Sequence, residues 1–438
     1  MGSGKSRAAR ALGGVDTDAL IEAAAGKTIP KIFVDEGETA FRMLEEETIV
    51  AALGGGAVTS PRVREALRDT LTIWLDVDVD TCWERVKGNS RRPLAQDEEA
   101  FRHLFEGRRR LYAEVADVVA KDVHDVVLAA AGVAVERGAL ARLAELVPGD
   151  GPVALVSDPQ VAGIHGAAAQ LALGSRLVET HELPLGEEAK TLAAVSRLWE
   201  ELRLGRDGTI VALGGGCTTD AAGFAAATHL RGVPWVAVPT SLVAQVDAAI
   251  GGKTAIDLPQ GKNLVGAFHW PIRTVIDPAL LETLPESQRL EGMAEVVKTG
   301  LLAGESLWKL PDDELVRQSA AFKAALCLRD PHDKGERKML NLGHTFAHAL
   351  EAAAGYDGSV THGRAVALGL LAALRLSGRD TRVVEELLHP QPVRVDRDRA
   401  WEALLRDKKG PLKLVLLSGY DVEVPAEDVR RELDRLIA

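Results

Sequence analysis

The side chains best suited to metal chemistry lie on predicted helices in the second half of the chain. Glu295 and Lys298, three residues apart, share one helix face. His344 and His348, four residues apart, share a face of another helix, and His362 follows in a predicted loop. One glutamate and two histidines can bind zinc and leave its fourth position open, as in a catalytic site. The spacing leaves open whether His348 is a ligand or a neighbour.

Two glycine-rich segments are suited to binding phosphate groups. The first, Gly-Ser-Gly-Lys-Ser at 2–6, ends a P-loop pattern, in which backbone N–H groups surround phosphates, Lys5 supplies charge and the Ser6 hydroxyl binds Mg²⁺. The second, Gly-Gly-Gly at 214–216, follows a predicted strand and opens an alanine-rich helix, so it can hold a pyrophosphate. Two lysines with glycine neighbours follow, Lys253 and Lys262. These segments predict a nucleotide-phosphate site and a dinucleotide site.

The elements that must position these residues alternate in type up to about residue 275. Short β-branched segments alternate with stretches rich in Ala, Leu, Arg and Glu, which is typical of parallel α/β construction. The predicted strands are 48–53, 71–77, 125–129, 153–157, 209–213, 235–238 and 273–276. Beyond residue 280 the predicted elements are helices, at 290–302, 313–328, 337–354 and 363–376.

Composition excludes several classes of protein. The 438 residues include 52 Lys and Arg against 64 Asp and Glu, a net charge of −12, so no overall positive field attracts nucleic acid or anionic lipid. Hydrophobic residues make up 46%, as in a folded globular protein. Cys82, Cys217 and Cys327 are widely spaced, which argues against a disulfide framework and favours the cytoplasm. No apolar segment suits secretion or membrane insertion.

An ordered set of motifs in residues 1–128 resembles shikimate kinase. After the P-loop segment come DTD at 16–18, GETAFR at 37–42, GGG at 54–56 and RPL at 92–94. The resemblance implies shikimate as substrate and ATP and Mg²⁺ as cofactors, and phosphoryl transfer depends mainly on positioning and charge neutralisation. It assigns the nucleotide phosphates to Gly2, Ser3, Gly4, Lys5, Ser6 and Arg92, Mg²⁺ to Ser6 and Asp16, adenine contact to Arg85, shikimate to Asp18, Arg42, Gly55, Gly56 and Arg108, and the catalytic base to Asp18.

Residues from about 131 onward look like 3-dehydroquinate synthase. The motifs that carry this resemblance are GGGCTTD at 214–220, VDAAIGGKT at 246–254, GMAEVVK at 292–298 and LNLGHTFAHALE at 340–351, together with GKN, HG and RDKK. The resemblance implies the cyclisation of 3-deoxy-D-arabino-heptulosonate 7-phosphate, with NAD⁺ as a recycled cofactor and Zn²⁺ or Co²⁺ as the metal. Clustered lysines in a cleft can attract this anionic substrate although the protein is acidic.

The same resemblance assigns roles to individual residues. Glu295, His344 and His362 would bind the metal, and His348 would lie by the substrate phosphate. NAD would be bound by Asp158, Glu187, Lys190, Gly215, Gly216, Asp220, Thr240, Ser241, Lys253, Lys262 and Thr283. The catalytic residues would be Asp247, Lys253, Lys298, Asn341 and His348, and the substrate would also contact Lys262, Asn263, Lys323, Arg337 and one of Lys408 or Lys409. Arg231 would reach the site of a neighbouring subunit, which implies a homodimer.

Several positions depart from the patterns of these families. Arg7 stands where the kinases have Thr, and Thr219 stands where the synthases have Gly. Arg364 stands where the synthase segment HGEAV has Glu, so it places a cation near His362, and we expect weaker support for that ligand. No residues precede the P-loop to form its supporting strand, so we expect a kinase part truncated at its N-terminus.

We therefore predict an α/β protein of three domains. A P-loop, shikimate kinase-like parallel-sheet domain covers 1–129, an α/β NAD-binding domain covers 130–278, and a mostly α metal- and substrate-binding domain covers 279–438. The predicted function is a 3-dehydroquinate synthase fused to a shikimate kinase in aromatic amino acid biosynthesis. Two alternatives remain: a non-catalytic kinase-like module, or a metal- and NAD-dependent alcohol dehydrogenase of the glycerol dehydrogenase kind, which the phosphate-side lysines argue against.

Overall fold

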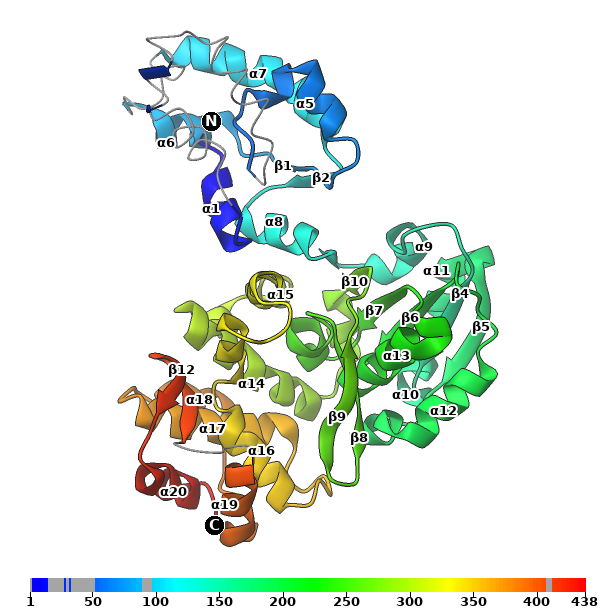
Figure 1. Cartoon of the computed structure of the whole chain (residues 1–438), viewed down its shortest axis with the longest axis vertical. Coiled ribbons are helices and arrows are strands. Elements are labelled where there is room, and N and C mark those ends of the chain that lie inside the picture. The colour runs from blue at the N-terminus through cyan, green and yellow to red at the C-terminus, as the bar shows by residue number, and fades with distance from the viewer. Residues whose placement is uncertain (1, 15–26, 29–30, 33–51, 89–96, 407–411) are drawn as a thin grey trace. The chain divides into compact units, whose positions relative to one another are not determined.

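The chain folds into two units, Met1–Ala131 and Gly132–Ala438, in a computed structural model (Figure 1). The structure describes residues 2–14, 27–28, 31–32, 52–88, 97–406 and 412–438. Each unit has hydrophobic clusters of its own. Among these residues there is no helix with the length and apolar character that a membrane crossing requires.

The first unit packs helices around a short parallel pair of strands. β1 (Ile73–Leu75) pairs with β2 (Val118–Ala120), and β1 lies within the predicted strand 71–77. Most of the predicted strand 48–53 lies outside the described residues. The α-helices described here are α1 (Lys5–Ala11), α5 (Pro61–Ala66), α6 (Val79–Val86), α7 (Glu98–Val115) and α8 (Val123–Ala130).

The strand predicted at 125–129 is wrong, because these residues lie in α8. A short apolar run does not distinguish a strand from a buried helix, so the polar residues ahead of it decide. Asp122 is the N-cap, and its carboxylate accepts from the backbone N–H of Asp125 at 3.0 Å. The Asp125 carboxylate accepts in turn from the N–H of Lys121 at 2.9 Å, so two otherwise unpaired donors at the helix start are satisfied.

The second unit is built on a six-stranded sheet in which every pairing is parallel. The order across the sheet is β3 (Val133–Val135), β10 (Arg273–Ile276), β7 (Trp235–Pro239), β6 (Thr209–Gly214), β4 (Val153–Ser157) and β5 (Leu177–Glu182). The four predicted strands from 153 to 276 are confirmed, whereas β3 and β5 were not predicted. β5 is an edge strand whose residues alternate between half-buried and exposed, so it lacks an uninterrupted apolar run.

Helices cover both faces of this sheet. On one face, alternate strand residues such as Ala154 and Ile210 pack with α12 (Leu192–Glu201) and α13 (Gly216–Thr228). The other face packs with α9 (Leu143–Leu146) and α11 (Ala167–Leu173). Because both faces are buried, the carboxyl ends of the strands form the open edge where such sheets bind ligands.

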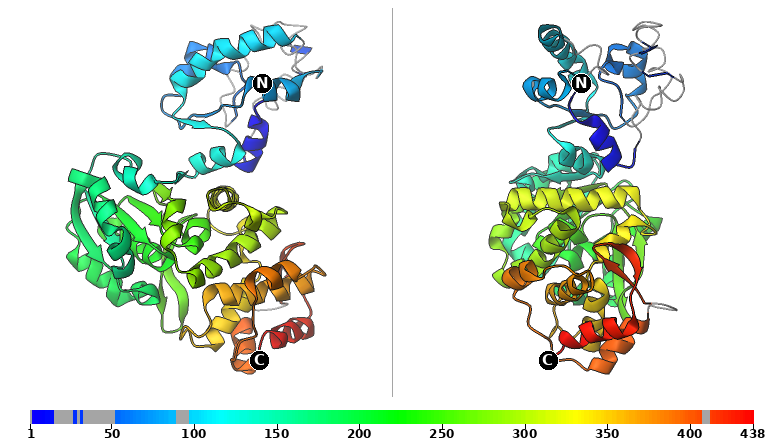
Figure 2. Two further views of the ribbon diagram at one scale, coloured as in Figure 1. Left: turned by 180° about the vertical axis from the view of Figure 1, so that it is seen from behind. Right: turned by 90° about the vertical axis from the view of Figure 1, so that its left-hand side faces the viewer.

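A helical part follows the sheet and lies beside it (Figure 2). The antiparallel hairpin of β8 (Lys253–Leu258) and β9 (Gly261–Phe268), which was not predicted, precedes β10. The helices are α14 (Glu286–Ala303), α15 (Asp312–Arg329), α16 (His344–Ala353), α17 (His362–Leu376), α18 (Arg382–Leu388), α19 (Arg397–Arg406) and α20 (Ala426–Arg435), with a second hairpin of β11 (Lys413–Leu416) and β12 (Gly419–Glu423). Most of them share one hydrophobic cluster.

The single helix predicted at 337–354 is divided in two. A 3-10 helix, η11 (Glu336–Asn341), ends before Leu342, and α16 starts two residues later. Gly343 separates them, because its φ of 80° is a left-handed conformation that a helix interior does not contain. A Cβ at this position would lie 2.9 Å from the backbone nitrogen of Leu370, so glycine also lets α16 approach α17 closely.

Candidate active sites

Three side chains that can bind a metal ion converge in the second unit. Glu295 lies within α14, His344 is the first residue of α16, and His362 is the first residue of α17 rather than part of a loop as predicted. Their ligand atoms lie within 4.8 Å of one another. Oε1 of Glu295 is 3.1 Å from Nε2 of His362 and 3.5 Å from Nε2 of His344. One carboxylate oxygen and two imidazole nitrogens suit Zn²⁺ or Co²⁺.

A buried network of alternating charges adjoins these three residues. Lys298, one turn after Glu295 on α14, contacts Glu295 Oε2 and lies 3.6 Å from Asp247 Oδ1. Lys323 lies 2.9 Å from Asp247 Oδ2 and donates to the backbone carbonyl of Asp247 at 2.7 Å. Burial disfavours the charge on Lys298, yet the two carboxylates raise its pKa. Burial alone would raise the pKa of Glu295, but Lys298 and the two histidines hold it well below its usual range.

Glu351 contacts the other side of His362. Its Oε2 lies 3.8 Å from Nδ1 of His362, and its Oε1 lies 3.4 Å from Nζ of Lys262. Partial burial disfavours the charged imidazole, but Glu295 and Glu351 together raise the pKa of His362 to about 10. Burial would raise the pKa of Glu351, yet His362 and Lys262 lower it to about 2. A divalent cation would replace the proton on Nε2, because an imidazole coordinates a metal through an unprotonated nitrogen.

A further carboxylate, Glu291, holds the start of α17. Its Oε2 accepts from the backbone N–H of Gly363 at 2.5 Å, and its Oε1 accepts from the hydroxyl of Thr361 at 2.5 Å. The guanidinium of Arg364 donates to the backbone carbonyls of Gln391 and Pro392, at 3.1 and 3.2 Å. The cation predicted beside the metal ligand is therefore bound to a neighbouring loop.

The residues predicted to contact substrate differ in their surroundings. Arg337 is 2% exposed and donates to the backbone carbonyls of Gly251 and Pro331, at 2.9 and 3.1 Å. Lys253 is exposed on β8 and pairs with Asp333 at 2.5 Å. His348 is exposed on α16, and its ring centroid lies 5.5 Å from that of His344. The last residue of η11 is Asn341.

Predicted NAD-binding residues cluster where parallel strands end. Asp158 follows β4, Gly215 follows β6, and Thr240 and Ser241 follow β7, so all lie at the carboxyl edge of the sheet. α13 starts at Gly216 directly after β6, so its N-terminus also faces this edge. The hydroxyl of Thr218 donates to Asp158 Oδ2 at 3.0 Å, while Thr283 lies 2.9 Å from His165 Nε2.

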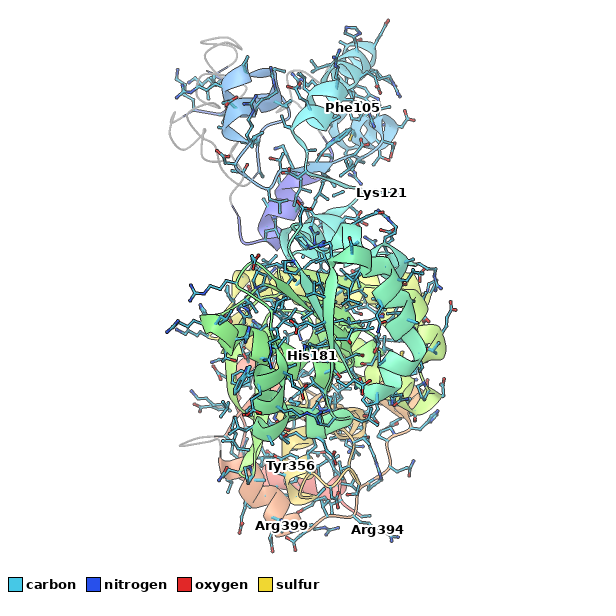
Figure 3. The ribbon with its side chains drawn as sticks, turned by 90° about the vertical axis from the view of Figure 1, so that its right-hand side faces the viewer. Phe105, Lys121, His181, Tyr356, Arg394 and Arg399 are labelled. Atoms are coloured by element: carbon cyan, nitrogen blue, oxygen red, sulfur yellow. The ribbon has the colours of Figure 1, made fainter. Side chains whose placement is uncertain are left out.

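A second buried charge network links this edge to the β8–β9 hairpin. Lys190 lies 2.8 Å from Asp220 Oδ2 and also donates to the side-chain oxygen of Asn263. Burial disfavours the charge on Lys190, yet the surrounding carboxylates, Asp220 first, raise its pKa. Burial raises the pKa of Asp220 although Lys190 opposes the shift. Glu187 lies 3.2 Å from Nζ of Lys262, which also contacts Glu351 and lies 5.4 Å from the centroid of the Tyr356 ring. Tyr356 is labelled in Figure 3.

The phosphate-binding segment of the first unit precedes α1. Gly2 and Gly4 have φ angles of 78° and 102°, and α1 begins at Lys5. A Cβ on Gly2 would lie 2.3 Å from the carbonyl oxygen of Cys82, so the close approach to α6 requires glycine. Arg85 of α6 donates to the carbonyls of Gly2 and Ser3, at 3.1 and 3.3 Å. In the described residues Arg85 therefore supports the loop that the sequence predicts to hold phosphate.

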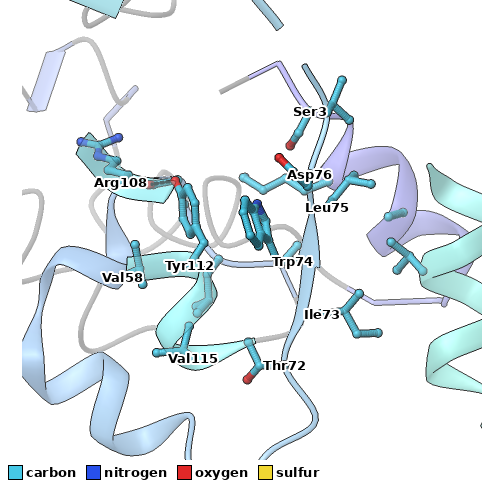
Figure 4. Close-up of a pocket in the computed structure, with 18 of the residues that line it drawn as sticks. Ser3, Val58, Thr72, Ile73, Trp74, Leu75, Asp76, Arg108, Tyr112 and Val115 are labelled. Carbon is cyan, nitrogen blue, oxygen red and sulfur yellow. Dashed lines mark hydrogen bonds between the residues drawn. The ribbon is translucent and has the colours of Figure 1, made fainter. Parts of the chain in front are cut away.

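A cavity of about 570 Å³ opens beside this loop (Figure 4). Its lining includes Ser3, Lys5, Gly55 and Arg108 from the predicted set. Tyr112 of α7, for which the motifs predict no role, donates from its hydroxyl to the carbonyl of Gly55. The predicted residues Asp16, Asp18, Arg42, Arg92, Lys408 and Lys409 lie outside the described residues.

Glu291 and Glu351 are the supporting residues that the sequence prediction missed. Glu351 had a usable signal, because it lies seven residues, about two helical turns, after His344 on α16. Glu291 had only a partial signal: it precedes Glu295 by four residues on α14, but its partner Gly363 is 72 residues away in the chain. Contacts between distant segments follow from helix packing, which a single sequence does not reveal.

Comparison with protein families gives three matches that cover most of the chain. The model described as shikimate kinase matches residues 1–137. The models described as 3-dehydroquinate synthase N-terminal and C-terminal match residues 180–291 and 292–409. The boundary between the latter two falls within α14, between Glu291 and Gly292.

Individual relatives agree with these matches. A bifunctional shikimate kinase/3-dehydroquinate synthase of Thermotoga maritima is 33% identical over 482 residues, covering 97% of this chain and 94% of the relative. A 3-dehydroquinate synthase of Latilactobacillus sakei is 42% identical over 252 residues, covering 54% of this chain and 70% of the relative. The crystal structure of a 2-deoxy-scyllo-inosose synthase with carbaglucose-6-phosphate, NAD⁺ and Co²⁺ matches 69% of this chain and 96% of its own, at 27% identity and a TM-score of 0.61.

Proposed function

Because the chain belongs to the family of bifunctional shikimate kinase/3-dehydroquinate synthases, we propose that its two units carry separate active sites built from the residues described above. The chain is an enzyme that joins a shikimate kinase domain to a 3-dehydroquinate synthase. The alternatives of a non-catalytic kinase-like module and a simple alcohol dehydrogenase are not favoured, because a bifunctional relative matches 97% of the chain.

The observation that carries the synthase proposal is the convergence of Glu295, His344 and His362 beside a buried lysine. When bound, a divalent metal would supply Lewis-acid polarisation of a substrate hydroxyl, and NAD⁺ would supply a recycled hydride acceptor. Lys298 contacts Oε2 of Glu295 and keeps this buried carboxylate ionised, so Oε1, which faces both imidazoles, is left to bind a dication. Zn²⁺ or Co²⁺ fits this donor set.

We assign recognition of the anionic substrate to the basic groups around the metal ligands. Lys323 and Lys298 share the carboxylate of Asp247, so their positive charges are held in place before substrate binds. Arg337 and Lys253 supply further charge, and His348 lies one turn from His344 on α16. These cations would stabilise the charge that develops as phosphate leaves. Geometry alone can then serve the later intramolecular ring closure.

We assign NAD to the carboxyl edge of the sheet. Asp158, Gly215 and Thr240 end neighbouring strands there, which is the position at which parallel α/β sheets bind dinucleotides. The N-terminus of α13 favours the pyrophosphate. Lys190 is buried and its partner Asp220 is partly buried beside this edge, and we assign both to cofactor contact.

Release of phosphate from 3-deoxy-D-arabino-heptulosonate 7-phosphate tests the synthase. With NAD⁺ and Zn²⁺ we expect phosphate release without net NADH, complete loss after chelation, and recovery on adding metal. E295Q should lose this activity, because the metal loses its anionic ligand. Steady accumulation of NADH instead would support the dehydrogenase alternative and contradict the proposal.

We assign the kinase site to the loop before α1 and the neighbouring cavity. The left-handed glycines and the N-terminal end of α1 present backbone N–H groups to phosphate, and Lys5 adds charge. Arg108, 8% exposed, lines the cavity where we place the carboxylate of shikimate. Shikimate-dependent formation of ADP tests this assignment. Protection of the chain against heat by shikimate, without any turnover, would contradict a catalytic role.

We also propose a homodimer in which Arg231 reaches the partner's active site. Leu230 and Arg231 both have positive φ, 50° and 70°, and both side chains are exposed. Two successive left-handed residues other than glycine are strained, and such strain is concentrated at functional positions. Light scattering at working concentration should give twice the chain mass, and a monomeric mass would contradict this proposal.

We propose the cytoplasm as the location of the enzyme. Cys82, Cys217 and Cys327 are all free thiols, and Cys82 and Cys327 are buried. Burial beside Glu187 raises the pKa of Cys217 to about 12, so its reactive thiolate is suppressed. Fractionation of cells that express the tagged full chain should recover it with cytosolic markers, and recovery outside the cytosol would contradict this location.

A further inference from the structure

Helix α17, which begins with the metal ligand His362, has no side-chain hydrogen bond from its own N-cap residue. Thr361 is the N-cap residue of α17, but its side chain makes no hydrogen bond to the start of the helix. In the capping-box pattern, a glutamate three residues after a Ser or Thr N-cap bonds back to the N-cap and completes the turn. That position is occupied here by Arg364, whose guanidinium is bound to the carbonyls of Gln391 and Pro392.

Glu291 supplies the missing carboxylate from another helix. Its Oε2 accepts from the N–H of Gly363, a donor in the first turn of α17, and its Oε1 accepts from the hydroxyl of Thr361. A carboxylate at a helix N-terminus is also favoured by the helix dipole. The two backbones touch, because a Cβ on Gly363 would lie 2.5 Å from Cα of Glu291. The residues on both sides of His362 are therefore held by one carboxylate.

The same helix provides the opposing ligand. Glu291 and Glu295 are four residues apart on α14, so they lie on one helix face, one turn apart. Glu295 faces Nε2 of His362 while Glu291 holds the backbone on either side of it. The separation between a ligand on α14 and a ligand on α17 thus depends on a contact made by α14 itself.

We propose that Glu291 is a positioning residue for the metal site: it caps α17 from α14, in place of a glutamate at position 364, and so fixes His362 opposite Glu295. This inference rests on the metal site of the proposed function. The proposal predicts that a carboxylate can stabilise the start of α17 from either of two positions, 291 on α14 or 364 on α17 itself.

The affinity of the full chain for Co²⁺, measured by its visible absorption in competition with a chelator, tests this proposal without an activity assay. Removal of a group that orients a metal ligand costs about 10- to 100-fold in affinity, so we expect E291A to bind Co²⁺ that much more weakly. E291Q keeps an oxygen that accepts from Gly363 but loses the charge, so we expect a smaller loss of about 3- to 10-fold. The matched control is E286A, an exposed glutamate in the first turn of α14, with affinity within about twofold of wild type.

The double variant E291A/R364E separates positioning from general packing. It restores an acid within α17 itself, so we expect Co²⁺ affinity to recover to within about threefold of wild type. Unchanged affinity in E291A would overturn the proposal, and so would a loss that R364E fails to recover, because packing alone would then explain it. Should E291A fail to fold, E291Q and E291Q/R364E give the same comparison. If the wild-type protein binds no Co²⁺, the metal site of the proposed function is wrong. If wild type and E291A bind Co²⁺ equally, the metal site stands and only the positioning role of Glu291 is wrong.

Discussion

Two lysine–aspartate pairs in the second unit have nearly the same length but different burial, and they allow one quantitative prediction. Lys190 lies 2.8 Å from Asp220, and their side chains are 6% and 19% exposed. Lys338 lies 2.9 Å from Asp421, with 33% and 48% exposed. K190M and K338M remove the same cation and replace it with a side chain of similar length. A difference between the two variants therefore reports burial together with the additional partners of Lys190, which are Asn263, Glu187 and Asp257.

The expected magnitudes follow from the surroundings of each pair. At 2.8 Å and an effective dielectric constant of about 20, the attraction between unit charges is about 6 kcal/mol. Part of this is offset by the desolvation of both groups, and loss of one partner of a buried pair costs about 3–5 kcal/mol. We expect K190M to lower the free energy of unfolding by that amount. K338M should cost far less, because solvent screens an exposed pair.

The effect of K190M should depend on pH with a defined sign. Burial raises the pKa of Asp220 above its unfolded value even with Lys190 present. A carboxyl with a raised pKa in the folded state contributes stability below its unfolded pKa and loses it as pH rises through the folded value. Removal of Lys190 raises this pKa further, so the destabilisation should be larger at about pH 8 than at about pH 5.5.

Urea unfolding of the full chain measures these differences, with hydrogen exchange of the β6 segment assigning the transition to the second unit. D220N in the K190M background should recover much of the loss, since the uncompensated buried charge is then gone. Equal losses in K190M and K338M would refute the reasoning. A loss that grows toward low pH would refute it as well.

Three further predictions concern single positions. K5M should lower shikimate-dependent ADP formation by at least about 100-fold and leave phosphate release by the synthase unchanged, and a parallel fall in both activities would contradict separate sites. D122A removes the N-cap of α8 and should lower the free energy of unfolding of the first unit by about 0.5–2 kcal/mol, measured by urea denaturation with D69A, at an exposed aspartate of the same unit, as the control. Equal stability of D122A and D69A would contradict the cap. G343A should cost about 2–4 kcal/mol in the second unit because of its left-handed φ and its contact with Leu370, and an unchanged melting temperature would show that this turn tolerates a side chain.

How far the sequence predicts the structure depends on burial. β4, β6, β7 and β10 are buried on both faces, so their uninterrupted apolar runs mark them clearly. The edge strand β5 alternates and escaped prediction. The apolar run of α8 was assigned to the wrong element, because its capping aspartates and not its hydrophobicity make it a helix.

Prediction of the site follows a different rule. Residues in local motifs, such as Glu295 with Lys298 and His344 with His348, were found because helical spacing alone places them on one face. The contact of Glu291 with Gly363 depends on how α14 packs against α17, so no local pattern contains it. The place of the Arg364 guanidinium also depends on packing. The carbonyls of residues 391 and 392 bind it, and the sequence around His362 does not indicate this contact.

The central claim, a recycled NAD⁺ at a metal site in the second unit, is tested most directly by counting turnovers per cofactor. The full chain, loaded with Zn²⁺, is given excess 3-deoxy-D-arabino-heptulosonate 7-phosphate and a much smaller amount of NAD⁺, and released phosphate is measured. We predict many phosphates released per NAD⁺, with no lasting NADH absorbance, and no release by E295Q. Phosphate release that stops at one per NAD⁺, or that persists in E295Q, would contradict the account.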